Sequence, residues 1–161
     1  MQGLTAVSFF EEAYKVKKGD IILVHTVAGG LGLLFAQLGK RFGATVIGTT
    51  STQAKADLAK ANGADHVILY PVEDTVKKVL ELTNNEGVDA VFDGVGKDTC
   101  VFIFCLLRTR DDISNPIRFD NNFKLIKRKG TIVSVGNASG AVDPVLLTKL
   151  VEKNVKLLRP T

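Results

Sequence analysis

A glycine turn between an apolar run and an amphipathic segment is the part of this sequence best suited to chemistry. It reads His25-Thr26-Val27-Ala28-Gly29-Gly30-Leu31-Gly32, and residues 20–26 have the composition of a buried strand. Leucine and phenylalanine then recur at helical spacing, so the glycines join a strand to a helix. Their backbone N–H groups can approach a pyrophosphate at the positive end of that helix. A tight turn that binds nothing is the alternative, because glycines alone are a weak signal.

The residues after the second predicted strand indicate which dinucleotide would fit. Residues 48–55 read GTTSTQAK, and no acidic residue occurs before Asp57. An acid here would bind the ribose diol of NAD, whereas hydroxyls and a cation suit the 2′-phosphate of NADP. Ser51, at a predicted helix N-cap, and Lys55, one turn later, favour NADP. A capped helix with an exposed lysine is the alternative.

Strand-like and helix-like segments alternate along the chain, the pattern of a parallel sheet with crossover helices. Gly43, Gly63 and Gly87 each follow a helical segment, where a left-handed glycine commonly ends a helix. Six strands predict an α/β Rossmann fold, a doubly wound parallel sheet in the order 3-2-1-4-5-6. Strands are predicted at 20–26, 44–49, 66–70, 89–95, 130–136 and 155–158, and helices at 3–14, 31–42, 52–62, 73–83, within 98–129, and at 144–152.

Length and composition place the chain among ordinary globular proteins. It has 161 residues, of which 45% are hydrophobic and 24% charged, which excludes disordered and fibrous classes. The one basic cluster, residues 124–129 (KLIKRK), is interpreted as a solvated helix end rather than a nucleic-acid patch. The longest apolar run, 101–107, is too short to span a bilayer. No secretory signal is recognised at the N-terminus, so a cytoplasmic location is expected.

The cysteines and histidines predict no metal site and no catalytic pair. Cys100 and Cys105 are the only cysteines, and His25 and His66 the only histidines, which is neither a metal-ligand set nor a disulfide framework. His25 ends a predicted strand. We expect it to be packed or hydrogen-bonded rather than catalytic.

Several segments together carry a specific resemblance to a known family. They are MQGLTA, VHTVAGGLGLL, GATVIGTTS, GADHVILY, GVDAVFDGVGKDT, RKGTIVSVGNASG and LLRPT. In combination they closely resemble the quinone oxidoreductases of the zeta-crystallin type, zinc-free members of the medium-chain dehydrogenase/reductase superfamily. The resemblance covers nearly the whole chain apart from one block. It implies NADPH-dependent reduction, by one electron or by hydride, of quinones and related α,β-unsaturated carbonyls.

The resemblance also implies which residues meet the cofactor. Thr26 and Val27 stand where the family commonly has two alanines, and their β-branched side chains are expected to narrow the turn. The implied residues are Ala28, Gly29, Gly30, Leu31 and Gly32 for the pyrophosphate; Ser51, Lys55 and Tyr70 for the 2′-phosphate; and Val95, Gly136 and Asn137 on the nicotinamide side.

Family members carry a further N-terminal domain, a partly open barrel whose loops form the far wall of the active cleft. Residues 1–161 resemble the NADP-binding Rossmann domain alone, without that substrate and catalytic domain. In the family the sixth strand pairs with its twin across a two-fold axis. The resemblance therefore implies a homodimer through residues 155–158.

Three functional hypotheses remain open at this point. The first is the cofactor-binding domain of an NADPH:quinone oxidoreductase, incomplete for catalysis on its own. The second is a non-enzymatic NADPH-binding or dimerisation module, which turnover with a quinone would distinguish from the first. The third is a nucleic-acid-binding protein, which is disfavoured because no aromatic platform lies beside the KLIKRK cluster.

Residues 100–118 (CVFIFCLLRTRDDISNPIR) have no counterpart in the family pattern, which continues from Thr99 directly to Phe119. This insertion of 19 residues carries both cysteines and has no helical or strand period of its own. It could be a lid or partner-binding loop. We favour a retained intron translated in frame, because the residues permit a GTGT donor at Thr99-Cys100, a CTAAC branch sequence at Ser114-Asn115 and a closing AG.

Deleting residues 100–118 is expected to raise the free energy of unfolding and to improve NADPH binding, because an apolar run without a partner favours aggregation. Denaturant unfolding and cofactor titration of both chains would measure this. A messenger RNA that contains the block as its dominant form, together with a deletion that weakens the fold, would show the insertion to be a genuine element.

Overall fold

The computed structural model describes residues 2–96, 119–138, 142 and 144–160. They form a six-stranded sheet in the order β3-β2-β1-β4-β5-β6, with every neighbouring pair parallel. This confirms the predicted doubly wound Rossmann order. The elements are α1 (Gln2–Ser8), η1 (Phe9–Ala13), β1 (Ile21–Val24), α2 (Gly30–Phe42), β2 (Thr45–Thr50), α3 (Gln53–Ala61), β3 (His66–Leu69), α4 (Thr75–Leu82), β4 (Val88–Asp93), α5 (Asn121–Leu125), β5 (Ile126–Ser134), α6 (Thr148–Val151) and β6 (Lys156–Leu158).

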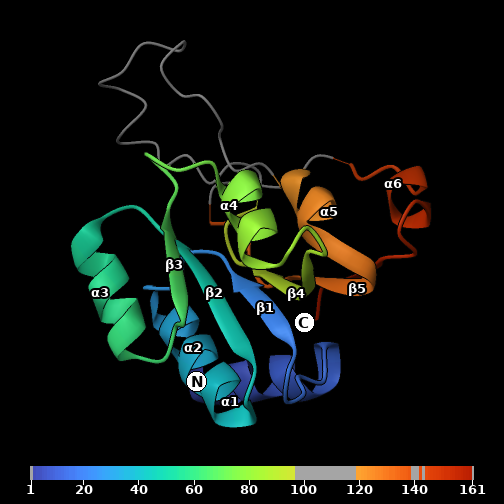
Figure 1. Cartoon of the computed structure of the whole chain (residues 1–161). Helices are drawn as coiled ribbons and strands as arrows, with labels where there is room; N and C mark the ends of the chain where they lie inside the picture. The colour runs from blue at the N-terminus through green and yellow to red at the C-terminus, as the bar shows by residue number, and fades with distance from the viewer. Residues whose placement is uncertain (1, 97–118, 139–141, 143, 161) are drawn as a thin grey trace.

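Helices cover both faces of the sheet, α1 and α2 on one face and α4 and α5 on the other (Figure 1). Successive side chains of each buried strand therefore enter different cores. Ile22 and Val24 of β1 pack in the core beneath α2, whereas Leu23 packs in the core beneath α4 and α5. Parallel strands covered on both sides are mostly apolar. β1 is apolar throughout, whereas β4 also carries Asp89 and Asp93.

Most element boundaries lie within two residues of the predicted ones, and three elements differ from their prediction. The predicted helix 3–14 is an α-helix that continues as a single π-helical turn, η1. Strand β5 begins at Ile126 rather than 130, because Ile126 already pairs with Val88 before a bulge in the β4·β5 ladder. Helix α6 is shorter than the predicted 144–152. The insertion 100–118 lies outside the described residues.

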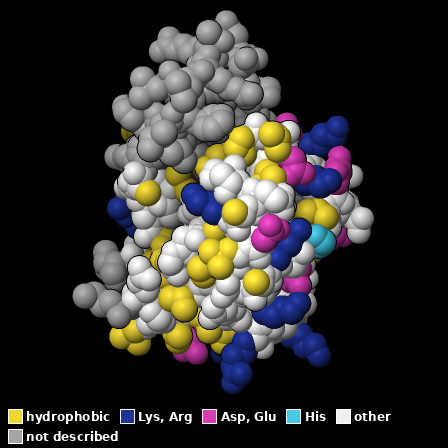
Figure 2. Space-filling model, turned by 90° about the vertical axis from the view of Figure 1, so that its left-hand side faces the viewer, with side chains coloured by type: hydrophobic (Ala, Val, Ile, Leu, Met, Phe, Trp, Pro, Cys, Tyr) yellow, Lys and Arg dark blue, Asp and Glu magenta, His cyan; other side chains and the backbone are white. Residues whose placement is uncertain are grey.

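The basic cluster 124–129 is a helix end only in its first two residues. It spans the last residues of α5 and the first of β5, with Leu125 and Ile126 buried. Lys127 pairs with Asp89 at 3.2 Å and Glu86 at 3.9 Å. On the face shown in Figure 2, Lys and Arg side chains are distributed among carboxylates rather than gathered in one patch. No helix in the described ranges is long and apolar enough to cross a membrane, and a cytoplasmic location stays a prediction.

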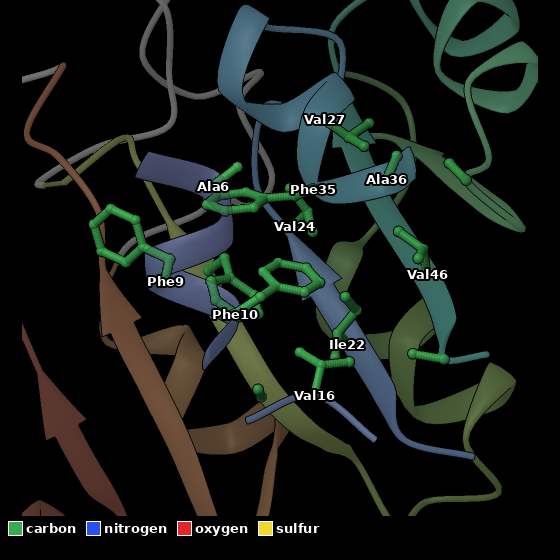
Figure 3. Close-up of a cluster of buried hydrophobic side chains, with 14 of the residues drawn as sticks. Ala6, Phe9, Phe10, Val16, Ile22, Val24, Val27, Phe35, Ala36 and Val46 are labelled. Atoms are coloured by element: carbon green, nitrogen blue, oxygen red, sulfur yellow. The ribbon is translucent and has the colours of Figure 1, made fainter. Parts of the chain in front are cut away.

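Three phenylalanines from different elements form the centre of the core beneath α2, and Figure 3 labels two of them, Phe10 and Phe35. Phe10 of η1 stacks on Phe35 of α2 and on Phe92 of β4, with ring centroids 5.2 Å and 4.9 Å apart. Phe35 and Phe92 are themselves 4.9 Å apart. Such ring pairs add to the area that each side chain buries. They fix the N-terminal segment and α2 on the sheet beside the glycine turn.

Candidate functional site

The glycine turn (residues 25–32) connects the end of β1 to the start of α2. Thr26 adopts a left-handed conformation, with φ of 52°, and its carbonyl accepts a hydrogen bond from the N–H of Gly29 at 2.8 Å. Gly29 is the N-cap of α2 and, being glycine, supplies no side-chain cap. The N–H groups of the first helical turn have no intrahelical acceptors. An anion placed there would meet both these donors and the positive end of the helix dipole.

Gly32 allows α2 to pack directly on the turn that precedes it. A Cβ at Gly32 would lie 2.5 Å from the carbonyl oxygen of Thr26 and 2.7 Å from that of Val27. At Gly29 a Cβ would lie 3.2 Å from the oxygen of Thr26. Gly29 and Gly30 are exposed, Ala28 and Leu31 half-buried, and Gly32 is buried. The five residues predicted for the pyrophosphate are thus close together, and the side chain of Gln2 lies against Gly30, where a Cβ would be 2.7 Å from the Gln2 Oε1 atom.

The β-branched residues Thr26 and Val27 differ in where their side chains lie. Thr26 is exposed, whereas Val27 is fully buried and packs in the core beneath α2. Space for Val27 comes from Gly48 of β2, where a Cβ would lie 2.3 Å from the Val27 Cγ1 atom. One of the two β-branched side chains therefore points away from the glycines.

Ser51, Lys55 and Tyr70 lie together at the carboxyl ends of β2 and β3. The Lys55 ammonium donates to the Ser51 hydroxyl at 3.4 Å. Tyr70 directly follows β3, and its N–H donates to the carbonyl of Thr50, the last residue of β2, at 3.2 Å. The predicted N-cap role of Ser51 is wrong. Thr52 caps α3, accepting from the N–H of Lys55, which leaves the Ser51 hydroxyl to face the lysine.

Val95, Gly136 and Asn137 lie on the two loops that follow β4 and β5. The loops are joined by backbone hydrogen bonds, from Val135 to the carbonyl of Asp93 at 2.7 Å and from Ala138 to that of Gly94 at 3.3 Å. The Asn137 amide, with its oxygen toward Arg159, accepts from that guanidinium at 3.0 Å. The eleven predicted residues thus occupy the glycine turn and the residues that follow β2 to β5, all at one edge of the sheet.

Sequence reasoning missed a group of buried polar side chains at the same edge. Asp93, Asn122 and Thr49 are at most 2% exposed. Asn122 bonds directly to Asp93, and His25 links Asn122 to Thr49. His25 is hydrogen-bonded through both ring nitrogens, as predicted. The one signal available was Asp93, an acid near the end of an otherwise apolar strand. Nothing in the sequence connects it to Asn122, which is 29 residues away.

Comparison with known proteins assigns this sequence to a family. Residues 30–110 match the family model described as zinc-binding dehydrogenase. The chain belongs to this family. It is 40% identical over 161 residues to a probable quinone oxidoreductase of Schizosaccharomyces pombe, covering all of this chain and 43% of the relative. It is 35% identical to quinone oxidoreductase 1 of Escherichia coli, again over the full chain and 44% of the relative.

Solved structures in the family superpose on the described fold. The Escherichia coli quinone oxidoreductase complexed with NADPH matches with a TM-score of 0.83 at 35% identity, covering 99% of this chain and 44% of that one. A 2-haloacrylate reductase matches with a TM-score of 0.84 at 32% identity, covering 100% of this chain and 45% of that one. The chain thus spans less than half the length of these relatives.

The zinc in the family's description has no ligand set in the described part of this chain. Within those residues, no group of three or more His, Cys, Asp or Glu side chains could hold a metal ion. Both histidine ring nitrogens of His25 are already hydrogen-bonded inside the sheet edge. We therefore derive no chemical step through zinc from these residues.

Gly32→Ala is expected to lower the free energy of unfolding by about 1 to 3 kcal/mol, the usual effect of overpacking, because backbone oxygens surround the position that the methyl group would occupy. Gly3→Ala is the matched control. Gly3 is helical and has no atom within 4 Å of an added Cβ, so we expect a gain of roughly 0.5 to 1 kcal/mol. Urea unfolding measures both, and equal effects of the two variants would contradict the close packing at Gly32.

Proposed function

We propose that this chain binds NADPH at the carboxyl edge of its sheet. The observation that carries the proposal is the Ser51–Lys55 pair beside Tyr70, where a ribose-binding acid would indicate NAD. Asp57 lies on α3 beyond Lys55 and accepts a hydrogen bond from Gln53. The glycine turn would hold the pyrophosphate, and the loops of Val95, Gly136 and Asn137 would flank the nicotinamide. NADPH bound to the Escherichia coli relative supports this choice of cofactor.

We further propose that the chain is the cofactor domain of a zeta-crystallin-type enzyme that reduces quinones or α,β-unsaturated carbonyls. The names of its relatives, quinone oxidoreductase and 2-haloacrylate reductase, support this class of acceptor. When bound, NADPH would supply the hydride. The residues of the glycine turn would bind the pyrophosphate. The loops that carry Val95, Gly136 and Asn137 would orient the nicotinamide ring at the carboxyl edge of the sheet.

A non-enzymatic NADPH-binding module remains the second candidate, because the chain covers less than half of its relatives. Nucleic-acid binding has less support. Lys127, inside the basic cluster, is engaged by two carboxylates, and the cluster is interrupted by the buried Leu125 and Ile126.

NADPH is expected to bind more tightly than NADH, and Lys55→Ala is expected to remove most of that preference. The loss should be roughly 1.5 to 3 kcal/mol, about 10- to 140-fold, the range for a hydrogen bond to a charged group. Lys60→Ala is the matched control, an exposed lysine in the last turn of the same helix. Calorimetric titration with both cofactors measures the preference. Equal affinities of the parent chain for NADPH and NADH would refute the proposal.

The 161-residue chain alone is expected to bind NADPH without reducing quinone above background. The described residues supply loops from a single sheet edge, and positioning a substrate against the cofactor is worth about 7 to 11 kcal/mol of the barrier. NADPH oxidation followed by absorbance, with and without a quinone, tests this. Oxidation that depends on quinone and is lost in Lys55→Ala would mean that these residues suffice for turnover.

We also propose a homodimer through β6. This strand pairs with β5 alone among the described strands, so its second edge has no strand partner within those residues, and its last residue, Leu158, is 37% exposed. An unpaired strand edge is a template for pairing with another chain, and a two-fold axis would close it.

Light scattering at micromolar concentration is expected to give twice the chain mass of 17.3 kDa. Leu158→Asp should shift the mass toward one chain, because a carboxylate would be desolvated at the interface. Leu58→Asp is the control, since Leu58 is 46% exposed on α3, which lies beside β3 at the opposite edge of the sheet. A parent chain with the mass of one chain would contradict the dimer.

A further inference from the structure

A continuous chain of buried polar side chains runs beneath the candidate site. Its members are Asp93 of β4, Asn122 of α5, His25 after β1 and Thr49 of β2, each at most 2% exposed. Polar groups are costly to bury unless each finds a partner. None of the four belongs to the predicted cofactor residues, yet all four are polar side chains in buried positions.

The hydrogen bonds of this buried polar chain have one consistent direction. The Asn122 amide nitrogen donates to Asp93 Oδ2 at 2.7 Å, which turns the amide oxygen toward His25 Nε2 at 2.9 Å. Because an amide oxygen only accepts, Nε2 must carry the hydrogen. In the neutral ring, Nδ1 then accepts from the hydroxyl of Thr49 at 3.1 Å. The carboxylate of Asp93 thus fixes the orientation of each following group.

One end of the buried polar chain holds the glycine turn. The Thr49 hydroxyl oxygen accepts from the backbone N–H of Thr26 at 3.4 Å. Thr26 is β-branched and left-handed, a conformation that is strained for such a residue and persists only where its surroundings impose it. Its carbonyl receives the N–H of Gly29 and lies against Gly32. The conformation of Thr26 therefore sets where the donors of α2 point.

The other end holds the loop on the nicotinamide side. Asp93 Oδ1 accepts from the N–H groups of Val95 and Gly96, at 2.9 Å and 3.2 Å. One carboxylate thus anchors the loop after β4 and, through three side chains, the turn after β1. The two anchored segments are those proposed to hold the two phosphates and the nicotinamide.

We propose that Asp93, Asn122, His25 and Thr49 are positioning residues that couple the glycine turn to the 94–96 loop and preset both for the pyrophosphate and nicotinamide of NADPH. The proposal rests on the proposed cofactor. It assigns these residues no contact with NADPH itself. Their effect is transmitted through the backbone of Thr26, Val95 and Gly96.

The first test compares two ligands on Thr49→Val, which keeps the shape of the side chain and removes the hydroxyl. NADPH affinity should fall about five- to tenfold, the effect of one lost hydrogen bond. Adenosine 2′-monophosphate meets only the Ser51, Lys55 and Tyr70 region, so its affinity should stay within about twofold of the parent. Thr49→Ser keeps the hydroxyl and should restore NADPH binding.

Thr83→Val is the matched control for buried hydroxyl loss. The Thr83 hydroxyl is buried and accepts from a loop N–H, that of Gly87, at 3.1 Å. It lies between α4 and the start of β4, at the amino ends of the strands and away from the candidate site. It should lower stability in urea without changing the ratio of the two ligand affinities. Asn122→Ala breaks the middle of the buried polar chain. Combined with Thr49→Val, it should weaken NADPH binding by less than the product of the two single effects.

A second measurement needs no ligand. Amide hydrogen exchange at Thr26 and Gly29 should be faster in Thr49→Val and in Asn122→Ala than in the parent, and unchanged in Thr83→Val. Unchanged exchange, or an unchanged ratio of NADPH to adenosine 2′-monophosphate affinity, overturns the positioning role. A folded parent chain that binds neither ligand overturns the proposed cofactor instead, and the exchange rates still decide whether the polar chain holds the turn.

Discussion

The close approach of α2 to the turn before it is the constraint on which the candidate site depends. The carbonyl of Thr26 accepts from Gly29 and occupies the space that a side chain at Gly32 would need. This contact brings the open N–H groups of the helix to the end of β1. It also requires Val27 to enter the core, and Val27 fits only because Gly48 of the next strand has no side chain. A local turn thus depends on a glycine in another element.

The strand order places this turn where a ligand can be reached from several directions. Between β1 and β4 the order of the sheet reverses, and the helices α2 and α5 lie on opposite faces. In doubly wound sheets a ligand binds at the carboxyl ends of the strands at this point. The loops that follow β2, β3 and β5 end at the same edge. Residues far apart in sequence, such as Ser51 and Tyr70, are therefore brought near each other by the pairing of β2 with β3.

Periodic apolar patterns made the sheet and its order predictable, because each strand and helix carries its own local signal. The glycine turn and the Ser51–Lys55 pair were equally accessible, since their members are neighbours in sequence. Thr52 rather than Ser51 became the N-cap because two adjacent hydroxyl residues are equivalent candidates until backbone geometry selects one. The early start of β5 depends on a pairing between Val88 and Ile126, which a single segment does not encode. The bond between His25 and Asn122 spans 97 residues and has no local pattern at all.

The position of Asn122 explains why the buried polar chain and the fold stabilise each other. Asn122 follows Phe119, which is 5% exposed in the core beneath α4 and α5, and its N–H donates to the Phe119 carbonyl at 3.0 Å. Gly96, the last described residue before this segment, donates to the same carboxylate that accepts from Asn122. Both described ends of the connection from β4 to α5 are therefore tied to Asp93. A carboxylate buried at the end of a strand is satisfied by three donors, and those donors in turn fix the path of the chain on both sides of the site.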